Sequence, residues 1–305
     1  MRNLIRVHFK RYLFRWEVAA VTILNILLSC ISVFLATQLY LSDGPFEKEQ
    51  FSKLFAVFFA LSLGATLTSV IFMESANFSS GALRNFLLGG YTKAQVFLSK
   101  YLCTGIFGAI QGALFLLPIA ILKIEKEYTA FFFLSILLTY IAVSCIAVTG
   151  FLLTPRQTLI TLCTILGLLL VTDASNLGTT ALDIEEFYYA PSQTNPTKIE
   201  STRDFDYVPS PARDVLEQTI RILPMQAVNE HILWYIPLNM EYLTYYAPTS
   251  SNEQEDTLMK LRKQQTEAYL NRHLRRIRVL PCYQLAAIII IAAGGTLLFR
   301  KRNLK

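Results

Sequence analysis

Long apolar runs that are almost free of charge dominate the chain. Five of them are long enough to cross a membrane as helices: Val18–Leu41, Leu54–Met73, Val96–Leu122, Ala130–Leu153 and Val279–Phe299. About 20 apolar residues cross the roughly 30 Å of hydrocarbon, and a helix satisfies its own backbone there. A sixth run, Thr158–Thr172, is shorter and spans only if it extends past Asp173 or the bilayer thins. The pattern predicts an all-α integral membrane protein with six transmembrane helices.

The composition agrees with this pattern. Of the 305 residues, 53% are hydrophobic and only 16% are charged, whereas a soluble domain has roughly 25% charged residues. A basic start before an apolar run also occurs in signal peptides. Because Val18–Leu41 is much longer than the roughly 7–15 apolar residues of a signal core, we interpret it as the first span.

The positions of the positive charges predict the orientation. Basic residues precede the first span, separate the second from the third, follow the fourth and fill the tail: Arg2, Arg6, Lys10, Arg11, Arg15, Arg84, Lys93, Lys100, Arg156, Arg300, Lys301, Arg302 and Lys305. Positive loops stay inside, so both termini are predicted to be cytoplasmic, which requires an even number of spans. The cluster from Arg272 to Arg278 disagrees, and the alternative has five spans with that loop inside and the tail outside. Since the net charge of +6 lies beside spans, it indicates contact with lipid and not with nucleic acid.

Three regions follow from these spans. Residues 1–173 hold an N-terminal helix, five spans and a cytoplasmic segment at 74–95, and residues 174–278 form a large extracytoplasmic, α-rich insertion. Residues 279–305 hold the last span and a basic cytoplasmic tail. Within the insertion, helices are predicted at Asp214–Leu233, interrupted by Pro224, and at Glu253–Ile277. Its tyrosines either pack a small domain or contact a peptide or glycan, and the pattern leaves both readings open.

The first 16 residues have an amphipathic pattern. At 100° per residue, one predicted face is apolar and holds Ile5, Phe9, Tyr12 and Trp16. The other faces are basic and hold Arg6, Lys10, Arg11 and Arg15. Such a helix lies in the membrane interface with its cations near anionic lipid. A basic orientation signal without a partner gives the same pattern.

The segment between the second and third spans predicts a short separate helix. Ser79 or Ser80 is expected to cap a helix that runs to Leu88, and Gly89-Gly90 is expected to end it. Thr92 and Gln95 then have capping-box spacing at the start of the third span. This helix would expose polar side chains that suit docking of another protein, although an ordinary helical connection fits the same chemistry.

This segment also resembles a known family. Glu74, the string Gly81-Ala-Leu-Arg84-Asn85-Phe-Leu-Leu-Gly89-Gly90-Tyr-Thr92-Lys93 and the following Val96-Phe-Leu-Ser99-Lys100 are similar to the permease subunits of bacterial type-2 ABC exporters. The basic start, six predicted spans, large outer loop and short tail extend the likeness to the whole chain. Gly90-Tyr91 and the long outer loop depart from the family pattern, and the loop leaves the substrate class open.

The resemblance implies a function and partners. In this family the segment docks onto a separate ATPase subunit, and two permease subunits, identical or different, form an export pathway in the bacterial cytoplasmic membrane. The docking residues implied here are Glu74, Gly81, Arg84, Asn85, Gly89, Thr92 and Lys93. The chain lacks the Gly-x-x-x-x-Gly-Lys-Ser/Thr phosphate cradle, so ATP and Mg are expected on the partner.

Other function classes have weaker support in the sequence. The histidines, His8, His231 and His273, lie outside the predicted spans and form no metal or protease motif, so we expect no enzyme and no cofactor in this chain. A proton-driven carrier needs acids inside spans, whereas Glu74 is placed at a span end and Lys100 is expected to snorkel to the interface. A membrane-anchored sensor with a ligand-binding outer domain remains the third hypothesis.

Overall fold

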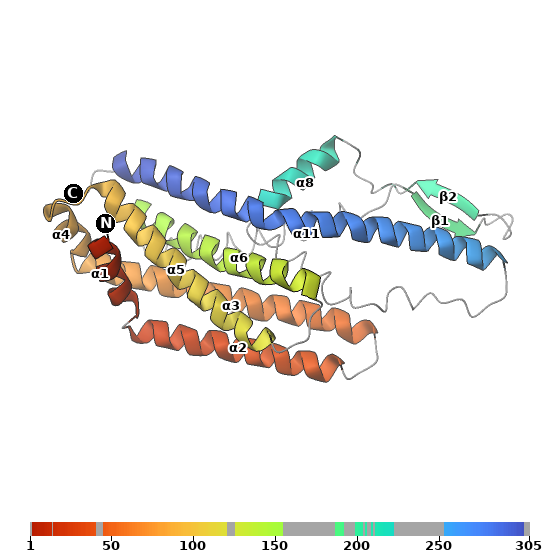
Figure 1. The fold of residues 1–305 in the computed structure, drawn as a ribbon, viewed down its shortest axis with the longest axis horizontal. Coiled ribbons are helices and arrows are strands. Elements are labelled where there is room, and N and C mark those ends of the chain that lie inside the picture. Colours follow the sequence, from red (N-terminus) through yellow and green to blue (C-terminus); the bar gives the residue numbers. More distant parts are fainter. Residues whose placement is uncertain are drawn as a thin grey trace.

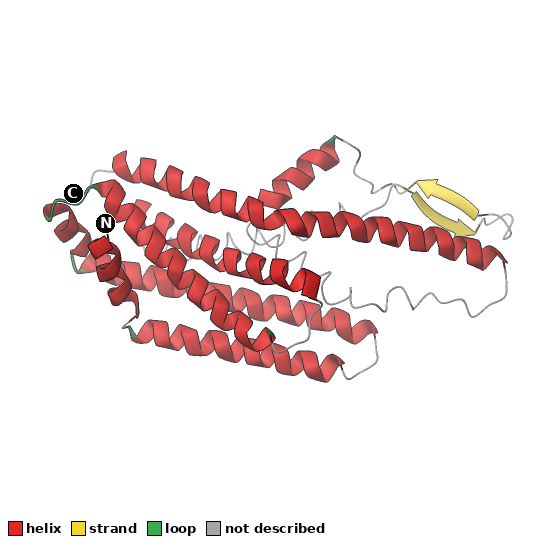
Figure 2. Cartoon of the chain, viewed as in Figure 1, coloured by secondary structure: helices red, strands yellow, loops and turns green. Residues whose placement is uncertain are grey.

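The computed structural model describes residues 2–13, 15–40, 45–120, 126–154, 187–191, 199–203, 205, 209, 211–222 and 253–301. The long helices are α2 (Trp16–Tyr40), α3 (Pro45–Ser79), α5 (Lys93–Ile119), α6 (Lys126–Leu153) and α11 (Glu253–Lys301). The short elements are α1 (Arg2–Leu13), α4 (Ala82–Leu88), α8 (Ala212–Ile222), β1 (Phe187–Pro191) and β2 (Ile199–Arg203). Figure 2 shows that helices make up nearly all of this described structure.

Within the described part of the chain, five helices are long and apolar enough to cross a membrane. The candidate spans are Trp16–Leu35, Val57–Ser79, Lys93–Ile119, Phe133–Leu153 and Arg278–Lys301. Each overlaps one of the five long apolar runs of the sequence, so these five predictions are confirmed at the level of helix and length. Together they indicate a multi-pass helical membrane protein. The predicted short span, Thr158–Thr172, lies outside the described residues.

The long helices form one elongated bundle (Figure 1). α5 packs against α6 and α2, α6 packs against α11, and α2 packs against α3. The chain ends marked N and C lie at the same end of the bundle, where α1 and α4 are also found. The short helices α1 and α4 therefore lie at the same end of the bundle as both termini.

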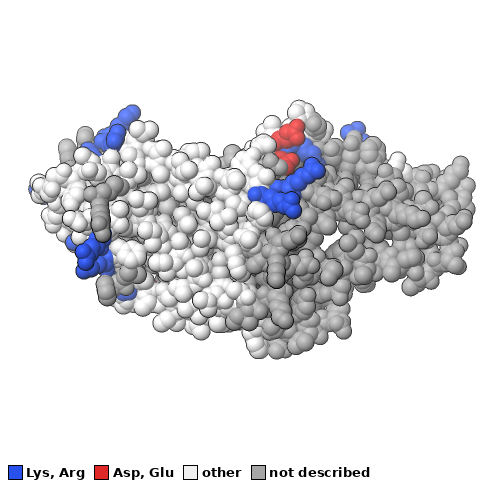
Figure 3. Space-filling model, viewed as in Figure 1, with Lys and Arg blue, Asp and Glu red and all other residues white. Residues whose placement is uncertain are grey.

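The surface of the bundle has the polarity that a lipid environment requires. Large apolar side chains point outward from several helices, including Ile23 (59% exposed), Leu117 (65%) and Ile290 (69%). Figure 3 shows a broad uncharged band along the bundle, with Lys and Arg at one end and both signs of charge near α8. An uncharged band that carries such exposed apolar side chains is stable when hydrocarbon and not water covers it.

Small residues on α5, namely Gly105, Gly108 and Gly112, bring it into close contact with α6. A methyl group on Gly108 would lie 2.6 Å from the backbone oxygen of Tyr140, and one on Gly112 would lie 3.0 Å from the Tyr140 ring. At Gly105 the nearest atoms, in Cys145 and Ile141, would be 3.5 and 3.7 Å away. The closest approach of the two backbones is therefore at Gly108.

Substituting Gly108→Ala is expected to destabilise the bundle by about 1–3 kcal/mol, because the backbone of α6 cannot give way as a side chain can. Gly105→Ala is the matched control and should stay near the wild-type stability, since its methyl group meets only ordinary contacts. The measurement is the fraction of protein that remains monodisperse in gel filtration after heating in detergent. Equal heat resistance of the two variants would contradict the close contact.

The region beyond the bundle contains part of what the sequence predicted. The predicted helix Glu253–Ile277 is confirmed, and it continues through Pro281 into the last candidate span as one helix of 49 residues. Of the predicted helix Asp214–Leu233, α8 is described to Ile222, and it contacts α11 through the Tyr283 hydroxyl, which donates to Gln218 Oε1 at 3.0 Å. The antiparallel pair of β1 and β2, with Tyr189 opposite Ser201, was not predicted.

Candidate functional site

The connection between α3 and α5 is built by local backbone chemistry. α3 ends at Ser79, and Gly81, at φ 67°, turns the chain and caps α4. The prediction that Ser79 or Ser80 caps α4 is wrong. Their hydroxyls donate backward instead, to the carbonyl oxygens of Ala76 at 3.1 Å and Asn77 at 3.0 Å. The reason is that α3 continues to Ser79, where free carbonyl groups compete successfully for both hydroxyls.

The end of α4 and the start of α5 match the prediction. Gly90, at φ 86°, has the left-handed conformation that side chains disfavour. The Tyr91 amide donates to Phe86 O at 3.2 Å and the Gly90 amide to Leu87 O at 3.1 Å, which is the Schellman arrangement. Thr92 and Gln95 form the capping box, with bonds of 3.2 Å and 2.9 Å. Two adjacent caps therefore fix the angle between α4 and α5.

Four of the seven predicted docking residues are exposed on this connection. Arg84, Asn85, Gly89 and Thr92 are exposed, and Gly81 and Lys93 are half-buried. Ala82 and Leu83 are buried and anchor α4 to the bundle. Leu88 is 75% exposed, which is unusual for leucine, and the sequence analysis did not single it out. We call the exposed set Arg84, Asn85, Leu88, Gly89 and Thr92 the α4 surface.

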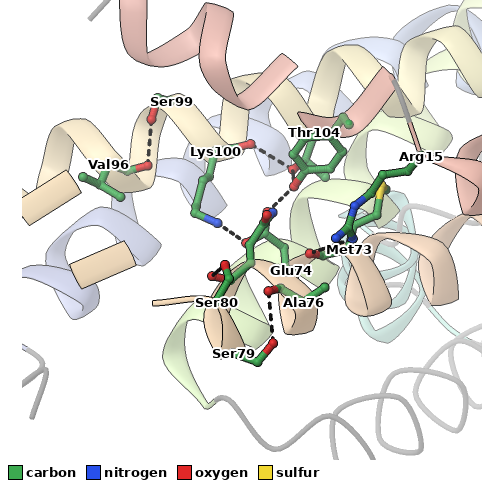
Figure 4. A network of polar contacts seen from close by, with 12 residues as sticks. Arg15, Met73, Glu74, Ala76, Ser79, Ser80, Val96, Ser99, Lys100 and Thr104 are labelled. Atoms are coloured by element: carbon green, nitrogen blue, oxygen red, sulfur yellow. Dashed lines mark hydrogen bonds and ion pairs between the residues drawn. The ribbon is translucent and has the colours of Figure 1, made fainter. Parts of the chain in front are cut away.

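Glu74 is separate from the α4 surface. It is buried inside the bundle (1% exposed) and forms an ion pair with Lys100, which is also buried (2% exposed). The Tyr12 hydroxyl of α1 donates a hydrogen bond to Glu74 and lies 3.1 Å from Thr104 Oγ1. Figure 4 shows the side chain of Lys100, from α5, directed at Glu74, from α3. Three helices therefore meet at one carboxylate.

Two predictions about these charges are wrong. Lys100 does not snorkel to the interface, and Glu74 does not sit at the end of a span, because the candidate span of α3 continues to Ser79. Each charge removes the need for the other to reach water, since a buried ammonium and a buried carboxylate can pair directly. The two residues are 26 positions apart, and their pairing depends on how α3 and α5 pack.

The orientation of α1 also differs from the predicted one. Leu4, His8 and Tyr12 are the side chains buried against the bundle, whereas the predicted apolar residues Ile5 and Phe9 are only half-buried. Tyr12 therefore does not face the membrane interface. The remaining predicted apolar residue, Trp16, begins α2 and is 77% exposed. The helix is rotated because Tyr12 finds a polar partner inside the bundle, which an apolar count cannot detect.

Most of the basic residues predicted for the polar faces of α1 have exposed side chains. Arg6, Lys10 and Arg11 are exposed, as expected for a polar face, and Arg15 is half-buried with its Nη1 3.5 Å from Met73 O. Figure 4 shows this contact between Arg15 and Met73 of α3. The exposed cations lie at the end of the bundle that also carries α4.

α1 contacts α4 directly through aromatic groups. The rings of His8 and Phe86 are 4.8 Å apart, and the Arg11 guanidinium lies 5.5 Å from the centre of the Phe86 ring. Burial, helped by the nearby Lys100 charge, lowers the pKa of His8 to about 4, so the ring is neutral at pH 7. Burial and the Glu74 carboxylate raise the pKa of Tyr12, so its hydroxyl keeps the proton that it donates. We call the set His8, Tyr12, Glu74, Phe86 and Lys100 the Glu74 cluster, and it links α1, α3, α4 and α5.

A second polar cluster lies deeper in the bundle and was missed by the sequence analysis. Asn25 Nδ2 donates to Gln111 Oε1 at 2.8 Å and to Thr66 Oγ1 at 3.1 Å, and Ser62 Oγ donates to Asn25 Oδ1 at 2.7 Å. Ser62 also bonds the Tyr140 hydroxyl, so α2, α3, α5 and α6 all contribute. Asn25 and Gln111 stand alone in apolar runs, and this pattern could have predicted the cluster, because a buried amide in lipid needs a partner on another helix.

Candidate metal ligands do not gather in the described residues, where no group of three or more His, Cys, Asp and Glu side chains is placed to hold an ion. Of the cysteines, Cys103 and Cys145 are buried, Cys30 and Cys282 are exposed, and Cys163 lies outside the described residues. Comparisons of the chain with protein-family models, with curated proteins and with solved structures find no match. Any functional conclusion therefore rests on the residues themselves.

Proposed function

We propose that this chain is the membrane-spanning permease subunit of an ATP-driven exporter, in which the α4 surface docks onto a separate ATPase subunit. The observation that carries the proposal is α4 itself. It is a short helix, separated from both neighbouring helices by fixed turns, that presents Arg84 and an exposed leucine at one end of the bundle. Exposed arginine beside an apolar side chain is typical of the centre of a protein interface.

The packing beneath α4 suits the transmission of movement. Its ends continue into α3 and α5 through the Gly81 turn and the Gly90 and Thr92 caps, and Phe86 contacts α1. The Glu74–Lys100 ion pair then joins α3 to α5 below this level. A displacement of α4 by a partner would therefore move the spanning helices α3 and α5 and the N-terminal helix α1 together.

The energy source is proposed to be another chain. The sequence has no phosphate cradle for ATP, so ATP and Mg are assigned to the partner, and a second permease subunit completes the pathway. A proton-driven carrier gains some support from Glu74, which is an acid inside a candidate span. However, Glu74 is paired with Lys100 and accepts a hydrogen bond from Tyr12, which favours a structural role for this carboxylate.

We further propose six spans with both termini in the cytoplasm of a bacterial cell. The location of the N and C ends at the same end of the bundle supports an even number of spans (Figure 1). α6 runs toward that end and α11 starts from the opposite one, which supports one more crossing between them. The alternative of five spans requires the two termini on opposite sides.

The orientation is testable with single cysteines in a variant that lacks the native ones. Lys10→Cys and Lys301→Cys should resist an impermeant maleimide in intact cells, and Val215→Cys on the exposed face of α8 should react. All three should react once the cells are opened, which controls for buried sites. Labelling of Lys301→Cys together with protection of Val215→Cys would support the five-span alternative.

The experiment that tests the function is purification of the tagged protein in mild detergent, followed by mass spectrometry of the proteins that accompany it. We expect an ATPase subunit with a phosphate cradle to co-purify with the wild-type chain, and to be lost from Leu88→Asp, which changes only the α4 surface. Repeated recovery of a well-folded chain alone would overturn the proposal. It would favour a membrane-anchored sensor, for which α11 provides a continuous helix from the outer region to the end of the bundle that carries α4.

A further inference from the structure

An open groove runs between α1 and α5 on the outside of the bundle. Its volume is about 740 Å³, and the described residues that line it are Asn3, Ile5, Arg6, Phe9 and Ile106. Sites for small organic ligands have volumes of roughly 300–1,000 Å³. The groove is distinct from the α4 surface and from the Glu74 cluster, because α1 turns Leu4, His8 and Tyr12 toward the bundle and leaves this other side open.

Two kinds of side chain line the groove. Arg6 and Asn3 offer a guanidinium and an amide, and both side chains are exposed. Ile5, Phe9 and Ile106 offer apolar surface, and Ile106 belongs to the candidate span Lys93–Ile119, where it is 44% exposed. The groove therefore joins a cationic, hydrogen-bonding site at α1 to a hydrocarbon-facing site on a spanning helix.

We propose that this groove is a discrete binding site for one anionic phospholipid. The phosphate group would be held by Arg6 and Asn3, and an acyl chain would lie along Phe9 and Ile106. Charge decides the occupant: α1 (Arg2–Leu13) has no acidic residue, and Arg6, Lys10 and Arg11 are exposed at the end of the bundle where Figure 3 shows basic side chains. Basic pockets beside spanning helices bind anionic head groups in this way.

A second copy of the chain is a poorer occupant of the groove. Symmetric pairing through this face would bring the cations of two α1 helices together, and like charges in contact are destabilising. The Cys103 thiol, which donates to Ile5 O at 3.5 Å, and the Tyr12 hydroxyl hold α1 on the bundle, so the groove is present before a ligand arrives. The proposal does not depend on the proposed transport function.

The test is native mass spectrometry of the full-length protein exchanged into detergent with phosphatidylglycerol, or with phosphatidylcholine as the uncharged comparison. One tightly retained phosphatidylglycerol is expected per chain, and much less phosphatidylcholine. Arg6→Gln should weaken retention about fivefold, the usual effect of one cation near an anionic lipid surface. Ile106→Trp should displace the lipid by filling the apolar part of the groove.

Each variant has a matched control on the same helix. Lys10→Gln removes an exposed cation one turn away on α1 that does not line the groove, and Leu117→Trp adds the same bulk at an exposed position elsewhere on α5. Both should retain lipid like the wild type, and gel filtration should show that all four variants are folded. Equal losses for Arg6→Gln and Lys10→Gln would show general charge attraction and would overturn the proposal. So would crosslinks from Ile106 to a second copy of the chain.

Discussion

Replacing Glu74 with glutamine is expected to destabilise the protein by about 3–5 kcal/mol, the usual cost of removing one partner of a buried ion pair. The substitution keeps the size of the side chain, so the loss is electrostatic. It leaves the ammonium group of Lys100, which is only 2% exposed, without its counter-charge inside the bundle. It also leaves the Tyr12 hydroxyl with a weaker acceptor, so α1 should loosen from α3 and α5.

The double variant Glu74→Gln/Lys100→Met identifies the cause of this loss. Methionine is close to lysine in length and carries no charge, so most of the lost stability should return, because the double variant buries no unpaired charge. Asp214→Asn, a change of the same kind at an exposed position of α8, should alter the stability by about 0.5 kcal/mol or less. The measurement is the midpoint of unfolding by a denaturing detergent, followed by tryptophan fluorescence. If the double variant were as unstable as Glu74→Gln, the ion pair would not explain the effect.

Reversing the charge at Arg84 is expected to abolish coupling to the ATPase subunit while the protein stays folded. Arg84 is exposed and belongs to the α4 surface, one helical turn from the exposed Leu88. The buried residues Ala82 and Leu83, and not Arg84, anchor α4 to the bundle. Arginine is among the residues that contribute most to interfaces, so Arg84→Glu should weaken binding of the partner by a factor of about thirty or more. The measurement is ATP hydrolysis and transport by the reconstituted complex, together with the amount of ATPase subunit that co-purifies.

Lys10→Glu is the matched control for Arg84→Glu. It reverses an exposed charge on α1, at the same end of the bundle as α4. It therefore tests whether losing any positive charge at this end is enough to weaken the complex. We expect it to retain coupling. The unfolding midpoint of Arg84→Glu should equal that of the wild type, which separates this variant from Glu74→Gln. Full coupled transport by Arg84→Glu would rule out α4 as the docking element.

Local patterns in the sequence were sufficient for the helices and for two of the turns. A long apolar run gives a spanning helix because the backbone has no other partner in lipid, and this holds for each run regardless of its neighbours. Gly90 and the Thr92–Gln95 pair were predicted correctly because those caps use residues within a few positions of each other. The prediction that Ser79 or Ser80 caps α4 was wrong, because their hydroxyls bind carbonyl groups at the end of α3 instead.

The sequence by itself determined that this is a helical membrane protein with an exposed, capped connection between α3 and α5. Only the tertiary structure decided which face of α1 is buried, that Lys100 pairs with Glu74, and that a groove opens between α1 and α5. The physical reason is the range of the interactions. Helix formation and capping act between residues close in the chain, whereas a buried charge or hydroxyl is stabilised by a partner from another helix, whose position depends on how the whole bundle packs.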